Sequence, residues 1–435
     1  MDNYWHSVTL ERDLCKGCTN CLKHCPTKAI RIQNGKAKIL KERCIDCGEC
    51  IRVCPYRAKK AVTDGFEIIE KFKYNIALVA PAFFSQFSLA DDIDIIMTAI
   101  KKTGFDHVYE VSRGAEKVTE KTKELISSGE LLKPTISTAC PAVVRLISLR
   151  FPNLLSNLIP LRSPMEVAAR DAKEEAALKT GLKEEEIGVI FISPCAAKAT
   201  AVKNPVTVNK SYVDGVISVN NLYKKMAHEI SKLSGEEIEK LSESGKKGIL
   251  WAIAGGEAAA TETQKHICVD GIHNVIDVLE AVEDDKLRDI EYVEALACPG
   301  GCVGGPLNVE NSFVAKSRLE RICRTISDKE NVELSDNVLW DKALVYRPVM
   351  NLDDDLHKAM EKAIKIEEIY EKLPKLDCGS CGSPGCHDLA EDIVRGYATE
   401  YDCIFKLKER INILAKEMLE LDGKFEMTKK DDEVI

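Results

Sequence analysis

The chain has 435 residues, of which 45% are hydrophobic and 30% are charged, and its formal net charge at pH 7 is −9. At about 100–200 residues per domain, this length accommodates roughly two to four domains. The acidic balance argues against nucleic acid as a partner, because phosphate binding requires clustered Lys and Arg. The longest apolar stretch, Ile76–Phe84, contains Pro81 and falls far short of the ~20 residues of a membrane-spanning helix, so no membrane association is expected.

The chain contains 18 cysteines, a density too low for a small disulfide scaffold and indicative of metal binding. Its first residues show no cationic stretch followed by an apolar one, so no export signal is visible. Together these observations predict a protein of the reducing cytoplasm. The cysteines lie in three blocks, Cys15 to Cys54, Cys140 to Cys323 and Cys378 to Cys403, which suggests three parts of the chain.

The N-terminal block repeats one run, Cys-x2-Cys-x2-Cys-x3-Cys-Pro, which ends first at Pro26 and then at Pro55. The repeat resembles the run of bacterial two-cluster ferredoxins, in which each [4Fe–4S] cluster takes three cysteines from one run and the fourth from the other. Structural zinc, the alternative, usually needs only two Cys-x2-Cys pairs or His ligands. The resemblance implies electron transfer. It assigns Cys15, Cys18, Cys21 and Cys54 to one cluster and Cys44, Cys47, Cys50 and Cys25 to the other.

The middle of the chain alternates apolar, β-branched runs with helical patterns, which predicts an α/β domain with a mostly parallel sheet covered by helices. Cys140, Cys195 and Cys298 each follow a predicted strand closely. Because ligands bind beyond the carboxyl ends of parallel strands, we expect these cysteines to converge on one spot. The predicted strands are 75–80, 106–111, 135–138, 187–193, 248–253 and 291–297, and the helices are 92–102, 164–178 and 220–233.

Three segments around these cysteines carry a more specific pattern. They read Ser-Thr-Ala-Cys-Pro to Pro141, Ser-Pro-Cys-Ala-Ala-Lys to Lys198, and Glu-Ala-Leu-Ala-Cys-Pro-Gly-Gly-Cys-Val-Gly-Gly to Gly305. In this order and at these separations they resemble the three signature loops of [FeFe]-hydrogenases. Val-Ala-Pro-Ala, ending at Ala82, and Ala-Gly-Gly-Glu, ending at Glu257, are similar to that family's cofactor-pocket segments.

The resemblance implies the reaction 2 H⁺ + 2 e⁻ ⇌ H₂ at an H-cluster, a [4Fe–4S] cluster joined to a diiron subcluster with CO, cyanide and azadithiolate ligands. Cys302 would bridge the two parts and Lys198 would reach a cyanide through a charge-assisted hydrogen bond, so both are the expected catalytic residues. The [4Fe–4S] ligands would be Cys140, Cys195, Cys298 and Cys302, and the other pocket residues Ala80, Pro81, Ala139, Ser193, Lys198, Gly255, Gly256, Leu296 and Gly301.

The sequence also departs from the family pattern. Ala139 stands where active members have a proton-donating cysteine, and Ala201 stands where they have a Glu. Ser193 and Leu296 replace expected methionines, and Pro306 interrupts the usual glycine run. Since neither alanine can carry a proton, the usual relay is missing at two points. The pattern resembles the sensory branches of the family and predicts slow turnover serving H₂ or redox sensing.

Two other functions stay open at this point. One is a ferredoxin-linked catalytic hydrogenase. The other is a non-catalytic assembly or scaffold protein in which the four middle cysteines hold only an electron-transfer cluster. Cys268 and Cys323 have no assigned ligand role, and both are expected to be buried core residues.

The C-terminal block reads Cys-x2-Cys-x4-Cys-x16-Cys, with glycines that allow tight turns around a metal. It resembles a small [4Fe–4S] module found beside redox and corrinoid proteins, and zinc is the rival. The expected ligands are Cys378, Cys381, Cys386 and Cys403.

The predicted architecture is therefore an α/β hydrogenase domain with an N-terminal ferredoxin-like domain and a small C-terminal Fe–S module. Expected partners are H₂ and protons, ferredoxin or another redox protein, a downstream signalling protein and a second copy of the chain. The predicted divisions are 1–65 for the two-cluster domain, 66–350 for the H-cluster domain, 351–373 for a linking helix, 374–410 for the C-terminal module and 411–435 for a helical tail.

Overall fold

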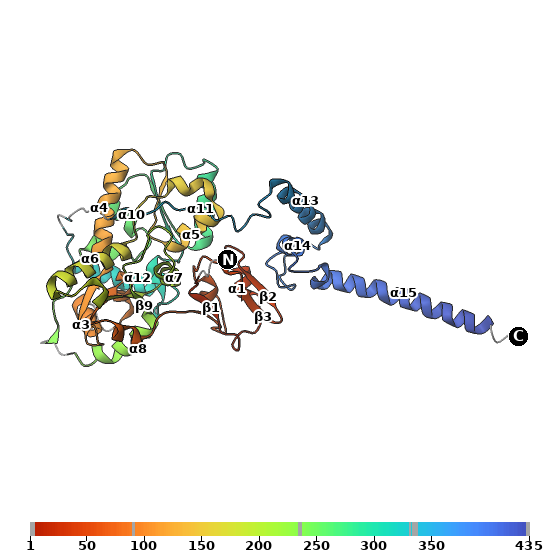
Figure 1. Ribbon diagram of the computed structural model, residues 1–435, viewed down its shortest axis with the longest axis horizontal. Coiled ribbons are helices and arrows are strands. Elements are labelled where there is room, and N and C mark those ends of the chain that lie inside the picture. The colour runs from red at the N-terminus through yellow and green to blue at the C-terminus, as the bar shows by residue number, and fades with distance from the viewer. Residues whose placement is uncertain (1–4, 89–91, 234–236, 330–331, 333–337, 432–435) are drawn as a thin grey trace. The chain divides into compact units, whose positions relative to one another are not determined.

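The computed structural model describes residues 5–88, 92–233, 237–329, 332 and 338–431 (Figure 1). The chain forms two compact units, each assembled from several stretches. Within the described ranges, no helix has the length and apolarity that crossing a membrane requires. The larger unit comprises Met1–Thr9, Lys41–Arg52 and Lys59–Val349, and the smaller unit comprises Leu10–Leu40, Val53–Ala58 and Met350–Ile435.

Two all-parallel sheets form the frame of the larger unit. The first has the order β6-β5-β8-β9 and the second the order β10-β11-β7. Since the strands are parallel, their carboxyl ends meet at one edge of each sheet. The strands are β5 Tyr74–Val79, β6 His107–Glu110, β7 Thr135–Ile136, β8 Ile187–Ser193, β9 Gly215–Ser218, β10 His266–Asp270 and β11 Tyr292–Leu296.

Alternating side chains of the first sheet build two separate apolar cores. Along β8, Ile190 and Ile192 join one core, whereas Val189 and Phe191 join the other. This period of two places a helix layer against each face, so the strands are apolar on both sides. The helices of the larger unit are α2 Glu49–Arg52, α3 Ile93–Lys101, α4 Val111–Ser128, α5 Pro141–Arg150, α6 Pro164–Thr180, α7 Ala196–Lys203, α8 Val219–Ile230, α9 Lys246–Leu250, α10 Gly256–Thr261, α11 Ile272–Glu283 and α12 Ser312–Ile322.

The predicted α/β fold with a parallel arrangement is confirmed, and five of the six predicted strands lie where they were expected. The strand expected at 248–253 is wrong, because this run begins inside helix α9. A short apolar run fits a buried helix as well as a buried strand. Here Gly248 packs against α4, where an added Cβ would lie 2.5 Å from the Ser112 carbonyl oxygen. Strands β9 and β10, and the division into two sheets, were not foreseen.

The N-terminal cysteine repeat is also visible in the backbone. Helix α1, Asn20–Lys23, and helix α2 occupy equivalent positions of the two runs. Lys28 and Arg57 have the same positive φ of 51°, and both donate their backbone N–H groups to the carbonyl of the last cysteine of their run. The flanking strands pair as β1 with β4 and β2 with β3, with bounds β1 Val8–Leu10, β2 Ile30–Gln33, β3 Lys36–Ile39 and β4 Lys59–Ala61.

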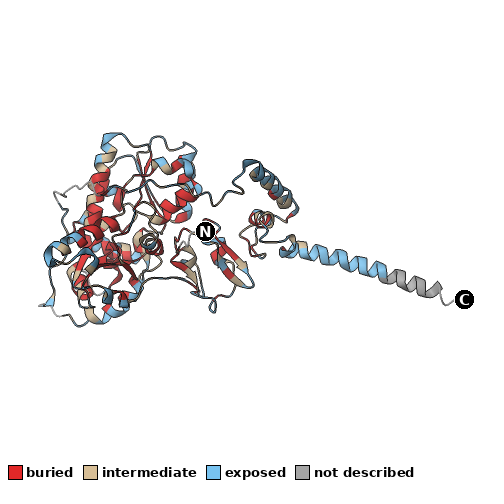
Figure 2. Cartoon of the chain, viewed as in Figure 1, coloured by how far each residue is buried: buried red, intermediate tan, exposed pale blue. Residues whose placement is uncertain are grey.

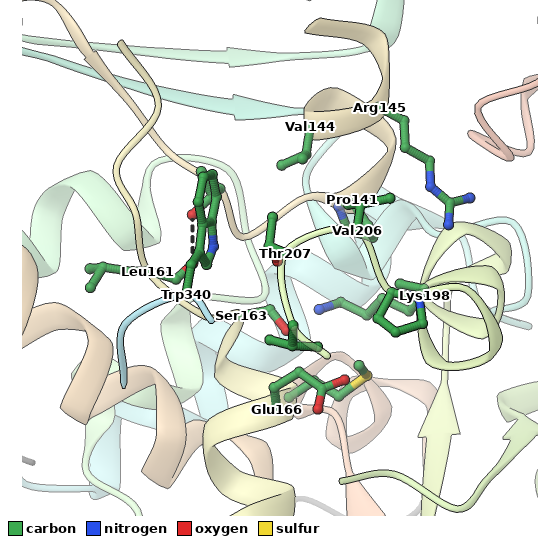
Figure 3. A pocket seen from close by; sticks show the side chains of 15 residues that line it. Pro141, Val144, Arg145, Leu161, Ser163, Glu166, Lys198, Val206, Thr207 and Trp340 are labelled. Atoms are coloured by element: carbon green, nitrogen blue, oxygen red, sulfur yellow. Dashed lines mark hydrogen bonds between the residues drawn. The ribbon is translucent and has the colours of Figure 1, made fainter. Parts of the chain in front are cut away.

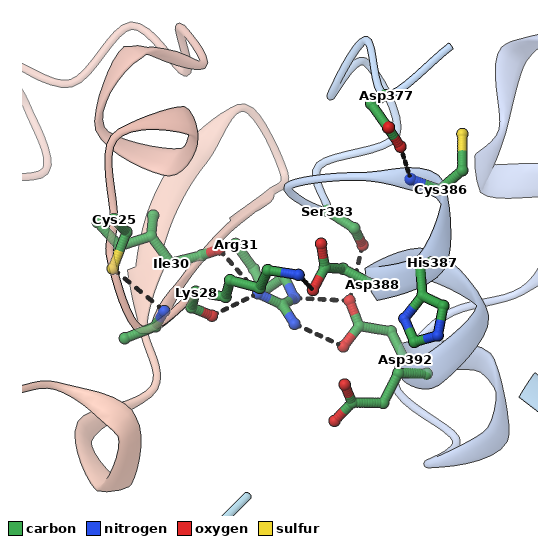
Figure 4. Close-up of polar contacts among 12 residues, drawn as sticks. Cys25, Lys28, Ile30, Arg31, Asp377, Ser383, Cys386, His387, Asp388 and Asp392 are labelled. Atoms are coloured by element: carbon green, nitrogen blue, oxygen red, sulfur yellow. Dashed lines mark hydrogen bonds and ion pairs between the residues drawn. The ribbon is translucent and has the colours of Figure 1, made fainter. Parts of the chain in front are cut away.

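The C-terminal stretch of the smaller unit packs onto its N-terminal strands (Figure 4). Arg31 on β2 binds Asp392 with two hydrogen bonds of 2.5 and 3.0 Å, and both side chains are buried. Ile32 N–H donates to the Gly382 carbonyl at 2.9 Å, and Lys28 pairs with Asp388 at 2.9 Å. The helices of this stretch are α13 Leu356–Lys372, α14 Cys386–Val394 and α15 Ile404–Asp431.

We predict that Arg31→Ala loosens this C-terminal stretch. Removing one partner of a buried ion pair leaves the other charge uncompensated, which typically costs about 3–5 kcal/mol. Hydrogen exchange of the full-length protein should therefore become at least tenfold faster within α14. Arg288→Ala, which removes an exposed pair with Asp285, serves as the control and should leave that exchange unchanged. Equal exchange in the Arg31 variant and the wild type would contradict the prediction.

Candidate metal centre

The four middle cysteines all lie beyond carboxyl ends of parallel strands. Cys140 follows β7 and is the N-cap of α5, and Cys195 follows β8 and is the N-cap of α7. Cys298 lies two residues beyond β11, and Cys302 opens the short 3₁₀ turn Cys302–Gly304. The positive end of a helix dipole stabilises a thiolate, so α5 and α7 each favour an anionic cysteine at their N-terminus.

The charges of these four cysteines interact, so their sulfur atoms converge on one site. Burial, and then the neighbouring Cys140, raise the pKa of Cys195 to about 11. Burial raises the pKa of Cys302 to about 12, with Cys195 and Cys140 adding to the effect. The pKa of Cys298 is raised by burial and by the other three thiols. A buried cage of four thiols with no His or carboxylate among them has the donor set of a [4Fe–4S] cluster or tetrahedral zinc.

Two cations face this cage. Lys198 on α7 acts on the charges of Cys195 and Cys302 and opposes the rise in their pKa values. Arg52, at the end of α2, does the same for Cys298, and its guanidinium donates to the Gly304 carbonyl at 3.0 Å. The sequence pointed to Lys198 but not to Arg52. The signal was available in principle, since Arg52 repeats Lys23 at the end of the equivalent helix in the first run.

Glycines of the third loop lie directly against the backbone of neighbouring segments. An added Cβ on Gly301, which has φ of 90°, would lie 2.6 Å from the Ala254 nitrogen. On Gly305 it would lie 2.4 Å from the Pro194 carbonyl oxygen. These close approaches lock the loop of Cys298 and Cys302 against the loops after β8 and α9. We expected the glycines to admit a cofactor, and the structure shows that they also hold the loops together.

Beside the cage lies a buried carboxylate cluster. Ser137 donates its hydroxyl to Glu257 at 2.7 Å, and Tyr292 donates to the same carboxylate at 2.6 Å. Burial and the nearby Glu294 raise the pKa of Glu257 to about 8. Glu257 therefore holds a proton at neutral pH. The hydroxyl of Ser137 also accepts the backbone N–H of Ala139 at 3.3 Å, which brings this acid close to the first loop.

Glu294 continues this cluster toward the protein surface. Its carboxylate accepts the N–H groups of Gly255 and Ala258 at 2.9 and 2.8 Å, and burial raises its pKa. The Cys268 thiol donates to Glu294 at 3.9 Å. Cys268 is exposed, so our expectation of a buried core thiol was wrong for it, whereas Cys323 is buried as expected. Sequence reasoning missed Glu294, because a carboxylate inside an apolar strand gives no sign of its partners.

A cavity of about 50 Å³ lies on the other side of Lys198 (Figure 3). Its lining includes Thr138 of the first loop, Ala201, and Glu166, whose carboxylate accepts the Ser211 hydroxyl at 2.6 Å. Burial raises the pKa of Glu166. At roughly 30 Å³ per water molecule, the cavity has room for one or two waters. Ala201, which stands where the family pattern has a carboxylate, lies in the mostly apolar lining of this cavity.

The other predicted pocket residues do not line this cavity, and they lie at strand or helix ends. Ala80 and Pro81 follow β5, at the start of the 3₁₀ helix Pro81–Gln86. Ser193 ends β8, and its hydroxyl accepts the Cys195 N–H at 3.1 Å, a local cap where the family has a thioether. Leu296 ends β11, and Gly255 with Gly256 begin α10. Their roles toward a cofactor stay predictions.

Backbone N–H groups point at the sulfur atoms of the N-terminal runs. Ala37 donates to Cys15 at 3.5 Å, and the equivalent residues Ala29 and Ala58 donate to Cys25 and Cys54 at 3.2 and 3.3 Å. Hydrogen bonds of this kind stabilise thiolate charge and tune the potential of a bound cluster. Cys15, Cys18, Cys21 and Cys54 all belong to the smaller unit, as one cluster would require, and Cys44, Cys47 and Cys50 belong to the larger unit.

The second run is anchored by a buried ionic network that sequence reasoning missed. Asp46 lies between Cys44 and Cys47 with φ of 54°, at the position of Gly17 in the first run. Its carboxylate binds His6 at 2.7 Å and Arg145 of α5 at 3.2 Å. Because α5 begins at Cys140, this network ties the second run to the four-cysteine cage. An Asp in a left-handed turn was the available signal.

The C-terminal cysteines surround a small core of their own. Cys381, Cys386 and Cys403 pack with apolar residues of α13 and α14. Asp377 accepts the Cys386 N–H at 2.6 Å. Hydrogen bonds from Ser380 lower the pKa of Cys378, whereas burial raises the pKa of Cys381. The three cysteines of this core, together with Cys378, whose charge interacts with that of Cys381, again match an Fe–S or zinc ligand set.

Comparison with known proteins adds independent evidence. Residues 73–306 match the family described as the iron only hydrogenase large subunit, C-terminal domain. Residues 7–55 match a 4Fe-4S dicluster domain, and residues 373–405 match an Fe–S cluster family. Each of the three matched ranges contains cysteines of a different one of the three blocks.

Curated relatives are hydrogenases of low identity. Iron hydrogenase 1 of Clostridium pasteurianum is 22% identical over 318 residues, which cover 60% of this chain and 55% of that protein. The NADP-reducing hydrogenase subunit HndD of Solidesulfovibrio fructosivorans is 24% identical over 55% of this chain and 51% of its own length. The chain therefore spans about half the length of these two relatives. The periplasmic [Fe] hydrogenase large subunit of Nitratidesulfovibrio vulgaris is 26% identical over 69% of this chain and 86% of its own length.

Solved structures similar to this chain include [FeFe]-hydrogenase HydA1 from Chlamydomonas reinhardtii, at 14% identity and a TM-score of 0.47 over 64% of this chain and 95% of that one. The family match extends over more than half of the chain and contains all four cysteines of the cage together with Lys198. The chain belongs to the family of the iron-only hydrogenase large subunit.

Proposed function

We propose that this protein is an [FeFe]-hydrogenase that interconverts H₂ with protons and electrons at an H-cluster, turns over slowly and serves H₂ or redox sensing in the cytoplasm. The convergence of Cys140, Cys195, Cys298 and Cys302 on one buried site supports this proposal most directly. When bound there, the H-cluster would supply the organometallic hydrogen chemistry, while the protein supplies position and electrostatics.

The residues of the cage fit such a cofactor. Four thiolates carry more negative charge than one buried site tolerates, and Lys198 and Arg52 reduce that charge. Lys198 also lies between the cage and the cavity of about 50 Å³, where an ammonium group can donate to an anionic ligand. A simple electron-transfer cluster would need the cysteines but not Lys198. This position of Lys198 favours a diiron site over the scaffold alternative.

We assign proton transfer near the cage to Glu257. Ala139 and Ala201 offer methyl groups where a thiol and a carboxylate would move protons. Glu257 keeps its proton up to a pH of about 8, and the exposed thiol of Cys268 lies at the far end of the Glu257–Glu294 cluster. Ser137 connects Glu257 to the backbone of Ala139. Proton transfer through the buried acids Glu257 and Glu294 would replace the missing thiol and carboxylate only partly. Slow turnover is therefore expected.

Electrons would reach the cage from the N-terminal runs. In the larger unit, Arg52 joins the second run to the loop of Cys302, and Asp46 joins it to α5. In the smaller unit, Gly379 of the C-terminal module lies against Leu22 and Lys23 of the first run, since an added Cβ would be 3.4 and 3.5 Å from these side chains. The C-terminal cluster is therefore proposed to exchange electrons with the first run, and with ferredoxin or a signalling protein beyond it.

We expect the anaerobically matured protein to show infrared bands of iron-bound CO and cyanide. These ligands absorb where protein does not, so the test reports the diiron group independently of activity. Lys198→Ala should weaken or shift the cyanide bands while leaving the iron of the four-cysteine clusters in place. A protein with all its four-cysteine sites loaded and no such bands would support the scaffold function instead.

The C-terminal module is expected to hold iron and sulfide rather than zinc. The double variant Cys378→Ser/Cys381→Ser of the full chain should lose about four iron atoms per chain after anaerobic reconstitution, as one [4Fe–4S] cluster requires. Cys268→Ser, a matched change of an unassigned thiol, should lose none. Elemental analysis decides the matter, and a stoichiometric loss of zinc with unchanged iron would identify a zinc site.

Turnover is expected to lie well below roughly 10³ s⁻¹, the upper end of ordinary enzymes, and to be limited by proton delivery. Glu257→Gln keeps the shape of the side chain but removes the acidic carboxyl proton. It should therefore lower H₂ production by about 10²-fold or more, the usual contribution of a positioned acid. Because Glu257 has a raised pKa of about 8, the wild type should lose activity as the pH rises through that value.

Glu166→Gln, a buried carboxylate on the cavity side of Lys198, is the matched control and should have a smaller effect. Ala139→Cys should raise the rate and reduce the solvent isotope effect between H₂O and D₂O. A wild type that reaches about 10³ s⁻¹ would favour the ferredoxin-linked catalytic hydrogenase. A slow wild type without an isotope effect would show that another step is limiting.

A further inference from the structure

The first eighteen residues of helix α15, Ile404 to Leu421, leave their side chains largely uncovered. The whole helix has 28 residues, from Ile404 to Asp431, and would extend about 42 Å at 1.5 Å per residue. From Ile404 to Leu421 every residue is exposed except Lys406, which is intermediate (Figure 2). The apolar core of the C-terminal module includes Cys403 but no residue of α15. The module is therefore complete without this helix.

Between Ile404 and Leu421, α15 exposes nine large apolar residues, of which three, Phe405, Ile413 and Leu419, lie off the regular pattern formed by the others. Six of them recur at alternating intervals of three and four residues, which is the a and d pattern of a coiled coil. Helices with this spacing present one continuous apolar seam to a partner helix of the same kind. Their exposed fractions are 51% for Ile404, 43% for Leu407, 55% for Ile411, 41% for Leu414, 70% for Met418 and 63% for Leu421.

The charges beside this seam match a second copy of the same helix in one orientation. Arg410 and Glu417 both precede an a residue, so both occupy g positions. In an antiparallel pair centred between Ile411 and Leu414, each a residue faces a d residue and Arg410 faces Glu417 of the other copy, twice by symmetry. In a parallel pair, Arg410 would face the uncharged Ala415, so it would form no ion pair. Charge complementarity therefore favours the antiparallel arrangement.

We propose that α15 is a dimerisation helix, through which two copies of this protein associate as an antiparallel coiled coil. The seam runs from Ile404 to Leu421, with Ile411 and Leu414 at its centre, and the Arg410–Glu417 pairs set the orientation. The dimer interface lies outside the cluster-binding residues, so it is independent of the proposed hydrogenase function. It gives a sensing protein a means of presenting two catalytic domains to one partner.

Analytical ultracentrifugation of the full-length, cluster-loaded protein tests this assignment. The wild type should sediment as a reversible dimer, and Ile411→Asp/Leu414→Asp should be a monomer with unchanged cluster absorption. Arg410→Glu places Glu opposite Glu at both pairs and should raise the dissociation constant at least tenfold. Lys416→Glu, the same charge change on the outer face of the helix, should leave the constant within about threefold, since isolated surface charges contribute little.

The exchange variant Arg410→Glu/Glu417→Arg distinguishes the orientations. It restores opposite charges in an antiparallel pair and should return the dissociation constant to within about threefold of the wild type. Continued weakness in the exchange variant would overturn the antiparallel seam. If the wild type stays monomeric up to millimolar concentration, the proposed dimer is wrong. This outcome covers the case in which the helix binds a different protein.

Discussion

The burial of four thiols at one place is the constraint on which the larger unit depends. Four thiolates can be buried together only if a metal centre and nearby cations compensate their charge. Parallel strands meet this demand, because their carboxyl ends bring loops from distant parts of the chain to one edge. Helix N-termini at Cys140 and Cys195, together with Lys198 and Arg52, then provide positive potential where the thiolates lie.

The rigidity of this site comes from polar and backbone contacts as much as from the apolar core. Gly301 and Gly305 bring the third loop within van der Waals distance of other backbone segments, where a side chain would collide. Asp46 and Arg145 form a buried pair that fixes the second cysteine run relative to α5. Thiol ligands must be deprotonated to bind metal, and their raised pKa values mean that loading the cage releases protons.

The same region of the larger unit holds both cations and buried acids. Cations face the cysteines on one side, and the buried acids Glu257 and Glu294 lie together on another. Burial raises the pKa of both acids, and Glu257, with a pKa of about 8, carries its proton at neutral pH without adding to the negative charge nearby. In the smaller unit, the buried Arg31–Asp392 pair joins the C-terminal cysteine module to the first run. The two redox modules of that unit therefore form one body.

Local sequence patterns predicted the α/β class and most strands correctly, because apolar runs depend on neighbours close in the chain, and cysteine spacing likewise supplied the metal-ligand assignments, which stay predictions. In the structure, the repeat at Cys15 and Cys44 reappears as equivalent helices and left-handed turns. What only the tertiary structure decided are contacts between residues far apart in sequence. Burial raises the pKa of Glu294, although the N–H groups of Gly255 and Ala258 oppose this rise. Arg52 acts as a counter-ion only because its helix meets the third loop, and Cys268 is exposed although its strand sequence gave no sign of it. The run 248–253 begins inside helix α9, where Gly248 packs on α4, although an apolar run of this length fits a strand equally well.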